Sequence, residues 1–116
     1  AGADGAIYVP SGQRVVLQEV VRDVPGPDGA ALRFRFLAPA IAREGGTVDV
    51  DQATEDMAYL CKTYAIQRAT GVVPVPTQII ISMSDIAVPF GDPAPEATQY
   101  FEAYRIVNGT CVWEGF

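Results

Sequence analysis

The chain has 116 residues, of which 49% are hydrophobic and 19% charged, a composition that fits one globular domain with its own core. Its formal net charge of -6 disfavours binding to nucleic acid or to an anionic membrane, because both need clustered lysine and arginine. The chain holds no histidine, which removes the commonest general base and the commonest neutral metal ligand.

The first third of the chain predicts strands. Residues 7–9 read as a short strand that ends at a proline, and residues 14–22 form a run rich in valine and leucine. Two prolines and two glycines within residues 23–29 predict a loop. Residues 31–38 alternate large apolar side chains with arginines, which predicts a strand with one buried face. The apolar face holds Leu32, Phe34 and Phe36, and the other face holds Arg33 and Arg35.

One long helix is predicted over residues 49–70. Asp49 is its expected N-cap, and Gln52 stands three positions later, which is the spacing of a capping box. A stripe at spacings of four, three and four residues predicts the face that packs on the sheet. This stripe consists of Ala53, Met57, Leu60 and Tyr64, and Gly71 is a plausible stop.

The last third predicts strands again. Residues 77–84 carry three consecutive isoleucines, which are typical of a central strand. Residues 85–98 contain three prolines and one glycine, and a loop of this length is either functional or mobile. Asn108-Gly109 lies between two apolar runs, which strongly indicates a hairpin of residues 99–106 and 110–113.

These elements predict an α+β fold. We expect a mostly antiparallel sheet of about five strands, with one long helix packed on one face, in the order β-β-α-β-β. The chain is expected to form a single domain over residues 1–116, with residues 1–5 flexible.

The two cysteines, Cys61 and Cys111, are interpreted as a structural disulfide between the helix and the last hairpin. Such a bond closes a loop of about 50 residues, which the chain-entropy model values at about 4 kcal/mol. Two buried reduced thiols and a redox-active pair are the alternatives. The redox alternative is disfavoured because the spacing is not Cys-x-x-Cys and no histidine is available to stabilise a thiolate.

The carboxylates give only weak indications of a site. Four acids near the helix start could ligate calcium, but a helix N-terminus attracts acids for structural reasons alone. Asp85 and Asp92 bracket the proline-rich loop and are a second candidate group for a ligand or for acid–base chemistry. No nucleophile motif and no phosphate-binding loop is present, so we expect no catalytic residue and no cofactor.

Aromatic residues concentrate near the C-terminus and form a candidate interaction surface. In residues 99–106, Phe101 and Ala103 alternate with Tyr100 and Tyr104, so one set faces the core while the other is either covered or exposed. The alternative is that both sets are partly buried and that Trp113 packs on the disulfide. The residues predicted to contact a partner are Tyr100, Tyr104, Trp113, Phe116 and Phe90.

The chain resembles a family of small exported alphaproteobacterial proteins of unknown function. The similarity covers nearly the whole chain after residue 8 and is carried by residues 34–43, 57–61, 80–85, 98–106 and 109–114. It implies a periplasmic location but brings no functional residues with it. The chain also begins with Ala1-Gly2-Ala3 rather than methionine, as after signal-peptide cleavage, and no run of about 18 apolar residues spans a bilayer.

The sequence therefore predicts a non-catalytic periplasmic domain that binds another protein, such as a subunit of a membrane complex facing the periplasm. The alternative is a module that binds a small molecule or Ca²⁺ through residues 85–98. An enzyme that relies on carboxylates ranks last.

Overall fold

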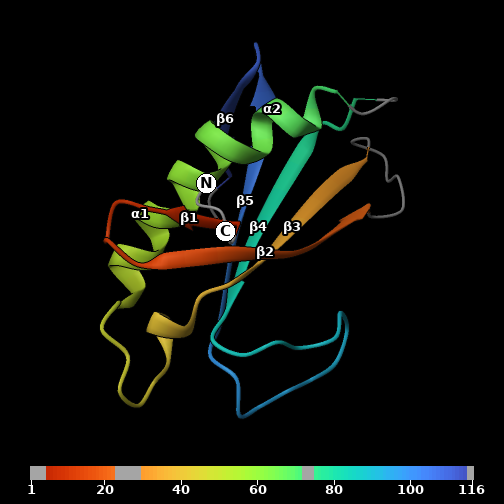
Figure 1. Cartoon of the computed structure of the whole chain (residues 1–116). Helices are drawn as coiled ribbons and strands as arrows, with labels where there is room; N and C mark the ends of the chain where they lie inside the picture. The colour runs from red at the N-terminus through yellow and green to blue at the C-terminus, as the bar shows by residue number, and fades with distance from the viewer. Residues whose placement is uncertain (1–4, 23–29, 72–74, 115–116) are drawn as a thin grey trace.

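A computed structural model describes residues 5–22, 30–71 and 75–114, and it shows a curled six-stranded sheet with a helix packed on one face (Figure 1). The strands are β1 (Ala6–Tyr8), β2 (Arg14–Arg22), β3 (Ala31–Leu37), β4 (Gln78–Ser84), β5 (Gln99–Val107) and β6 (Thr110–Trp113). The helical segments are η1 (Pro39–Ile41), α1 (Val50–Leu60), η2 (Cys61–Ala65) and α2 (Ile66–Ala69).

The strands lie in the sheet in the same order as in the chain. All neighbours are antiparallel except β3 and β4, which are parallel because the helix lies in the connection between them. The predicted α+β fold with a mostly antiparallel sheet is confirmed. The strand count is six rather than about five, and the order is β-β-β-α-β-β-β, because residues 6–8 pair with residues 14–16.

Short sequence patterns correctly predict the start of the helix and the turn of the last hairpin. Asp49 caps α1 by accepting a hydrogen bond from the Gln52 amide at 2.9 Å, while the Gln52 side chain accepts from the Asp49 amide at 3.1 Å. Asn108 and Gly109 both have positive φ angles, 51° and 75°, as a two-residue hairpin turn requires. A five-residue π-helical turn, η2, joins α1 to α2 and has no recognisable signal in the sequence.

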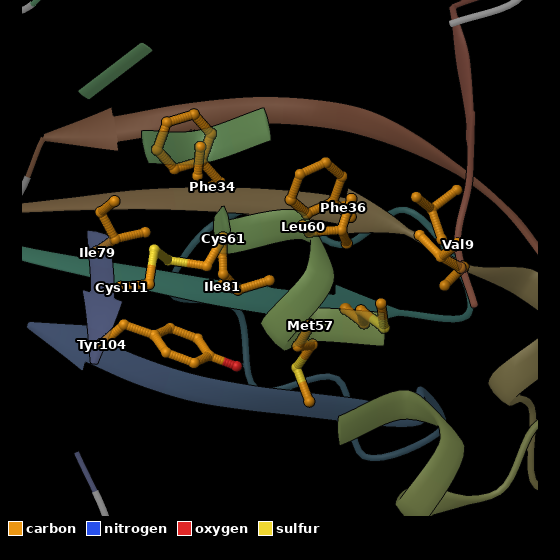
Figure 2. Close-up of a cluster of buried hydrophobic side chains, with 14 of the residues drawn as sticks. Val9, Phe34, Phe36, Met57, Leu60, Cys61, Ile79, Ile81, Tyr104 and Cys111 are labelled. Carbon is orange, nitrogen blue, oxygen red and sulfur yellow. A yellow bond between two sulfur atoms is a disulfide. The ribbon is translucent and has the colours of Figure 1, made fainter. Parts of the chain in front are cut away.

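The core lies between the helix and one face of the sheet, which we call the helix face (Figure 2). Phe34 and Phe36 are buried there, and the Tyr64 ring meets both edge-on at centroid distances of 6.3 and 5.7 Å. The predicted stripe is confirmed, since its other three members are buried in the same cluster: Ala53, Met57 and Leu60.

A buried carboxylate ties the β1–β2 turn to the helix. Asp56 is fully buried, although it belongs to the acids expected at the start of the helix. Its oxygens accept from the Ser11 amide at 2.9 Å, from the Ser11 hydroxyl at 2.5 Å and from Gln13 Nε2 at 2.8 Å. Three donors thus offset the cost of taking this carboxylate out of water.

The disulfide between Cys61 and Cys111 is present and joins the π-helical turn to β6 (Figure 2). Both residues are buried and belong to the core cluster. The predicted disulfide between the helix and the last hairpin is therefore confirmed. Among the described residues, no helix has the length and apolar character needed to cross a membrane.

Candidate functional site

The opposite side of the sheet, here called the second face, carries a row of polar and aromatic side chains. Strand register aligns Glu19 of β2 with Arg35 of β3, Arg35 with Ser82 of β4, and Ser82 with Phe101 of β5. Side chains alternate between faces along a strand, so these four residues share one face. The alternation predicted for Arg33 and Arg35 opposite Phe34 and Phe36 is what places both arginines here.

Residues 85–98, here called the 85–98 loop, leave the sheet where β4 ends and return at the start of β5 (Figure 1, cyan to blue). Two hydrogen bonds close the loop at its base. The Asp85 amide donates to the Thr98 carbonyl at 3.1 Å, and the Thr98 amide donates to Asp85 Oδ1 at 2.7 Å. Arg43 holds the returning arm by donating to the carbonyl oxygens of Pro95 and Ala97 at 2.8 and 3.3 Å.

The outgoing arm of the 85–98 loop is bonded to the second face. The Val88 carbonyl accepts from Arg35 Nη2 at 2.6 Å and from Gln18 Nε2 at 3.1 Å. Arg35 also forms an ion pair with Glu19 through its other terminal nitrogen, so this buried guanidinium is a fixed part of the sheet. The loop is therefore anchored by side chains of β2 and β3.

Phe90 stands at the tip of a turn in this loop. The Asp92 amide donates to the Pro89 carbonyl at 3.0 Å, and Gly91 has a φ of 84°, which is the geometry of a type II turn. The Phe90 ring centroid lies 5.3 Å from the guanidinium carbon of Arg33 and 5.5 Å from that of Arg35. Each such cation–π contact contributes about 0.5–2 kcal/mol, which positions the ring over the sheet.

Loop and sheet together enclose a hollow of about 310 Å³. This volume is at the lower end of the range typical of binding pockets, about 300–1,000 Å³. Its lining includes the arginines Arg33 and Arg35 and the phenylalanines Phe90 and Phe101. Ser82 and Asp92 also line it.

Two phenylalanines of this hollow are exposed: Phe90 has 51% and Phe101 62% of its surface in contact with solvent. Val107 and Val112 extend the exposed apolar area along the same face toward the β5–β6 turn, at 37% and 39%. We call Phe90, Phe101 and the hollow that they line the Phe90–Phe101 surface. A cluster of exposed apolar side chains with polar neighbours is typical of a contact site.

The aromatic residues predicted to contact a partner are divided between different places. Phe90 lies on the Phe90–Phe101 surface. Tyr100 packs partly against the core and also lines the hollow, whereas Tyr104 is buried in the core at 2% exposure. Trp113 pairs with Tyr104 in the sheet ladder, so it lies on the helix face at the β6 edge. Trp113 is 60% exposed, and its ring nitrogen donates to Glu102 Oε2 at 2.5 Å. Phe116 lies outside the described residues.

Tyr104 shows the electrostatic consequence of this burial. Loss of solvation, and secondly the charge of Glu102, raise the pKa of its hydroxyl above the ordinary value near 10. Tyr104 is therefore a neutral core residue, and its burial excludes it from an accessible surface in the folded state.

The two acids that bracket the 85–98 loop have different surroundings. The Asp85 carboxylate accepts the Thr98 amide at the base of the loop, whereas Asp92 lines the hollow beside Phe90. In the described part of the chain, no three His, Cys, Asp or Glu side chains gather in a way that could hold a metal ion.

Sequence reasoning missed three contributors to this site, namely Arg33, Arg35 and Phe101. The signal for the arginines was present, because their alternation with Phe34 and Phe36 assigns them to the other face. The signal for Phe101 was incomplete, since β5 gave no indication of which of its faces meets the helix.

The fold and surface define an α+β domain with a helix-covered core and an aromatic–arginine surface on the opposite face. The chain matches the model of a family of unknown function (DUF6497) over residues 1–116, and it belongs to that family. No curated protein and no solved structure matches the chain significantly.

Proposed function

We propose that this chain is a non-catalytic domain that binds another protein through the Phe90–Phe101 surface. The observation that carries the proposal is the exposure of two large aromatic residues, 51% and 62%, that line one hollow. Aromatic side chains next to arginine are the residue types that dominate binding energy in protein interfaces. Exposed rings of this kind keep apolar surface in water until a partner covers it.

The surroundings of the rings support a binding role, because they are already ordered. Phe90 is held at its turn by two guanidinium groups, and Phe101 lies near the start of β5, where it is paired with Ser82 of β4. A surface that is rigid before binding loses little conformational entropy when the partner docks. We expect the partner to insert an apolar side chain between the two rings.

The proposed location is an oxidising compartment outside the cytoplasm, and specifically the periplasm. The Cys61–Cys111 disulfide supports this, since structural disulfides persist where thiols are not kept reduced. The resemblance to exported alphaproteobacterial proteins supports the same location. An accessory subunit of a membrane complex that faces the periplasm fits both the size of the chain and its surface.

The proposal is tested by affinity capture from native membrane extract with the purified protein and a Phe90→Ala/Phe101→Ala variant. Tyr8→Ala/Tyr59→Ala is the matched control, because both tyrosines are exposed aromatics, at 62% and 40%, on β1 and α1. We expect wild type and control to retain the same specific protein and the Phe90/Phe101 variant to lose it. Equal capture by all three proteins, or no specific capture by wild type, would refute the proposal.

A further inference from the structure

The edge strand β6 is held in the sheet in an unusual way. Among the described residues it is the last strand, with β5 on its inner side. Of its four residues, only Cys111 is buried, whereas Thr110, Val112 and Trp113 are exposed. The side-chain packing of β6 therefore depends on one cysteine, and that cysteine is bonded to Cys61.

The other attachments of this strand are polar and lie at or near the surface, and just after the strand the Glu114 amide donates to the Ala103 carbonyl at 2.9 Å. Trp113 donates to Glu102, and Gln78 Nε2 donates to Glu114 Oε1 at 2.9 Å just after the strand ends. Four residue pairs with β5 complete the ladder. Exposed contacts of this type contribute little, because water replaces the same hydrogen bonds when they open.

The central strand β4 is packed in a different way from β6. In β4, Ile79, Ile81 and Met83 are all buried against the helix, so leaving the sheet exposes three large apolar side chains. Local openings follow such differences in buried apolar contact. On this measure β6 opens far more easily than β4, unless the disulfide prevents it.

We propose that the Cys61–Cys111 disulfide retains β6, and that its reduction releases residues 107–114 while the helix and the remaining strands stay folded. The reductant is a dithiol. One thiolate of the dithiol attacks Sγ of Cys111, which is the less completely buried of the two cysteines, and Cys61 leaves as the thiolate. The second thiol then displaces Cys111, so that two electrons and two protons pass to the cysteines and the dithiol becomes a cyclic disulfide.

Release of β6 changes what the molecule presents to others. The outer edge of β5 becomes unpaired, because Tyr104 and Ile106 lose their ladder partners Trp113 and Cys111. An unpaired strand edge is a template for the addition of a strand from another chain. The disulfide thus controls a second interaction edge, which is separate from the Phe90–Phe101 surface and does not depend on it.

Amide hydrogen exchange read by mass spectrometry tests this inference. The samples are the oxidised protein, the same protein reduced with dithiothreitol, and a Cys61→Ala/Cys111→Ala variant without reductant. We expect a peptide covering residues 107–114 to exchange at least about tenfold faster in the reduced protein and in the variant. Peptides covering residues 53–60 and 79–83 should keep their protection.

Two results would overturn the inference. In the first, residues 107–114 keep the same protection after reduction, and in the second, all peptides lose protection together because the whole domain unfolds. The variant treated with dithiothreitol is the control for effects of the reagent, and it should not change. If the variant fails to fold, the reduced wild-type protein still decides between these outcomes.

Discussion

The two faces of the sheet are built from the same strands but have opposite character. On the helix face, Phe34 is fully buried and meets Tyr64. On the second face, Phe101 lines a hollow together with the polar residues Arg35 and Ser82 and is 62% exposed. The difference shows that burial on the helix face supplies stability, whereas the second face keeps apolar surface that the fold itself does not use.

The largest effect that tests this comparison comes from the same substitution on each face. Phe34→Ala should lower the free energy of unfolding by about 3–5 kcal/mol, because it leaves a cavity in the core. Phe101→Ala should change it by no more than about 0.5 kcal/mol, because the ring is exposed. Urea denaturation measures both values. Equal costs for the two variants would mean that the two faces do not differ as described.

The disulfide is the next largest contribution to the helix face. Cys111→Ser should lower the free energy of unfolding by about 2–5 kcal/mol, because the closed loop spans 50 residues and no longer restricts the unfolded chain. Thermal unfolding of the variant and of Cys61→Ser should give the same loss. An unchanged melting temperature for either variant would contradict this role.

The buried Asp56 tests whether polar groups also stabilise the helix face. Asp56→Asn should cost about 1–3 kcal/mol, because an amide nitrogen replaces one of the two oxygens that accept from Ser11 and Gln13. Glu55→Gln is the matched control, since Glu55 is the exposed neighbour and should have almost no effect. Denaturation of both variants at pH 7 makes the comparison, and similar losses would contradict it.

Alkaline pH offers a separate test of the burial of Tyr104. The pKa of this tyrosine is higher in the folded protein than in the unfolded chain, so above pH 10 the unfolded chain releases a proton that the folded protein retains. The contribution of Tyr104 is therefore complete below pH 10 and falls above it, by no more than about 1.4 kcal/mol per pH unit. Tyr104→Phe should lose less stability than wild type between pH 10 and 11. Parallel curves for the two proteins would show that Tyr104 is not shielded.

The smallest expected effect concerns the start of the helix. Asp49→Ala should cost about 1 kcal/mol, because the Gln52 amide loses its capping acceptor. Circular dichroism during thermal unfolding measures this loss. A cost as large as that of Phe34→Ala would mean that the cap, rather than the buried face, determines the stability of the helix.

The features that the sequence predicts correctly depend mostly on residues only a few positions apart in the chain. The alternation around Phe34, the Asp49–Gln52 capping box and the Asn108-Gly109 turn are local signals, and the structure confirms all three. The disulfide was also predictable, because only two cysteines were available.

The remaining features depend on contacts between distant residues. Phe90 reaches Arg33 and Arg35 from more than fifty residues away, and Asp56 is buried by a turn 45 residues earlier. No pattern in the sequence encodes those distances. For the same reason, the aromatic residues of β5 cannot be divided by sequence alone into buried Tyr104 and exposed Phe101.

Photocrosslinking in intact cells shows whether a partner docks on the Phe90–Phe101 surface. A benzophenone side chain is placed at position 101 in one sample, and at position 59 on the exposed side of α1 in another. We expect one protein to be crosslinked from position 101 and not from position 59. An absence of adduct at position 101, or the same adduct from both positions, would contradict it.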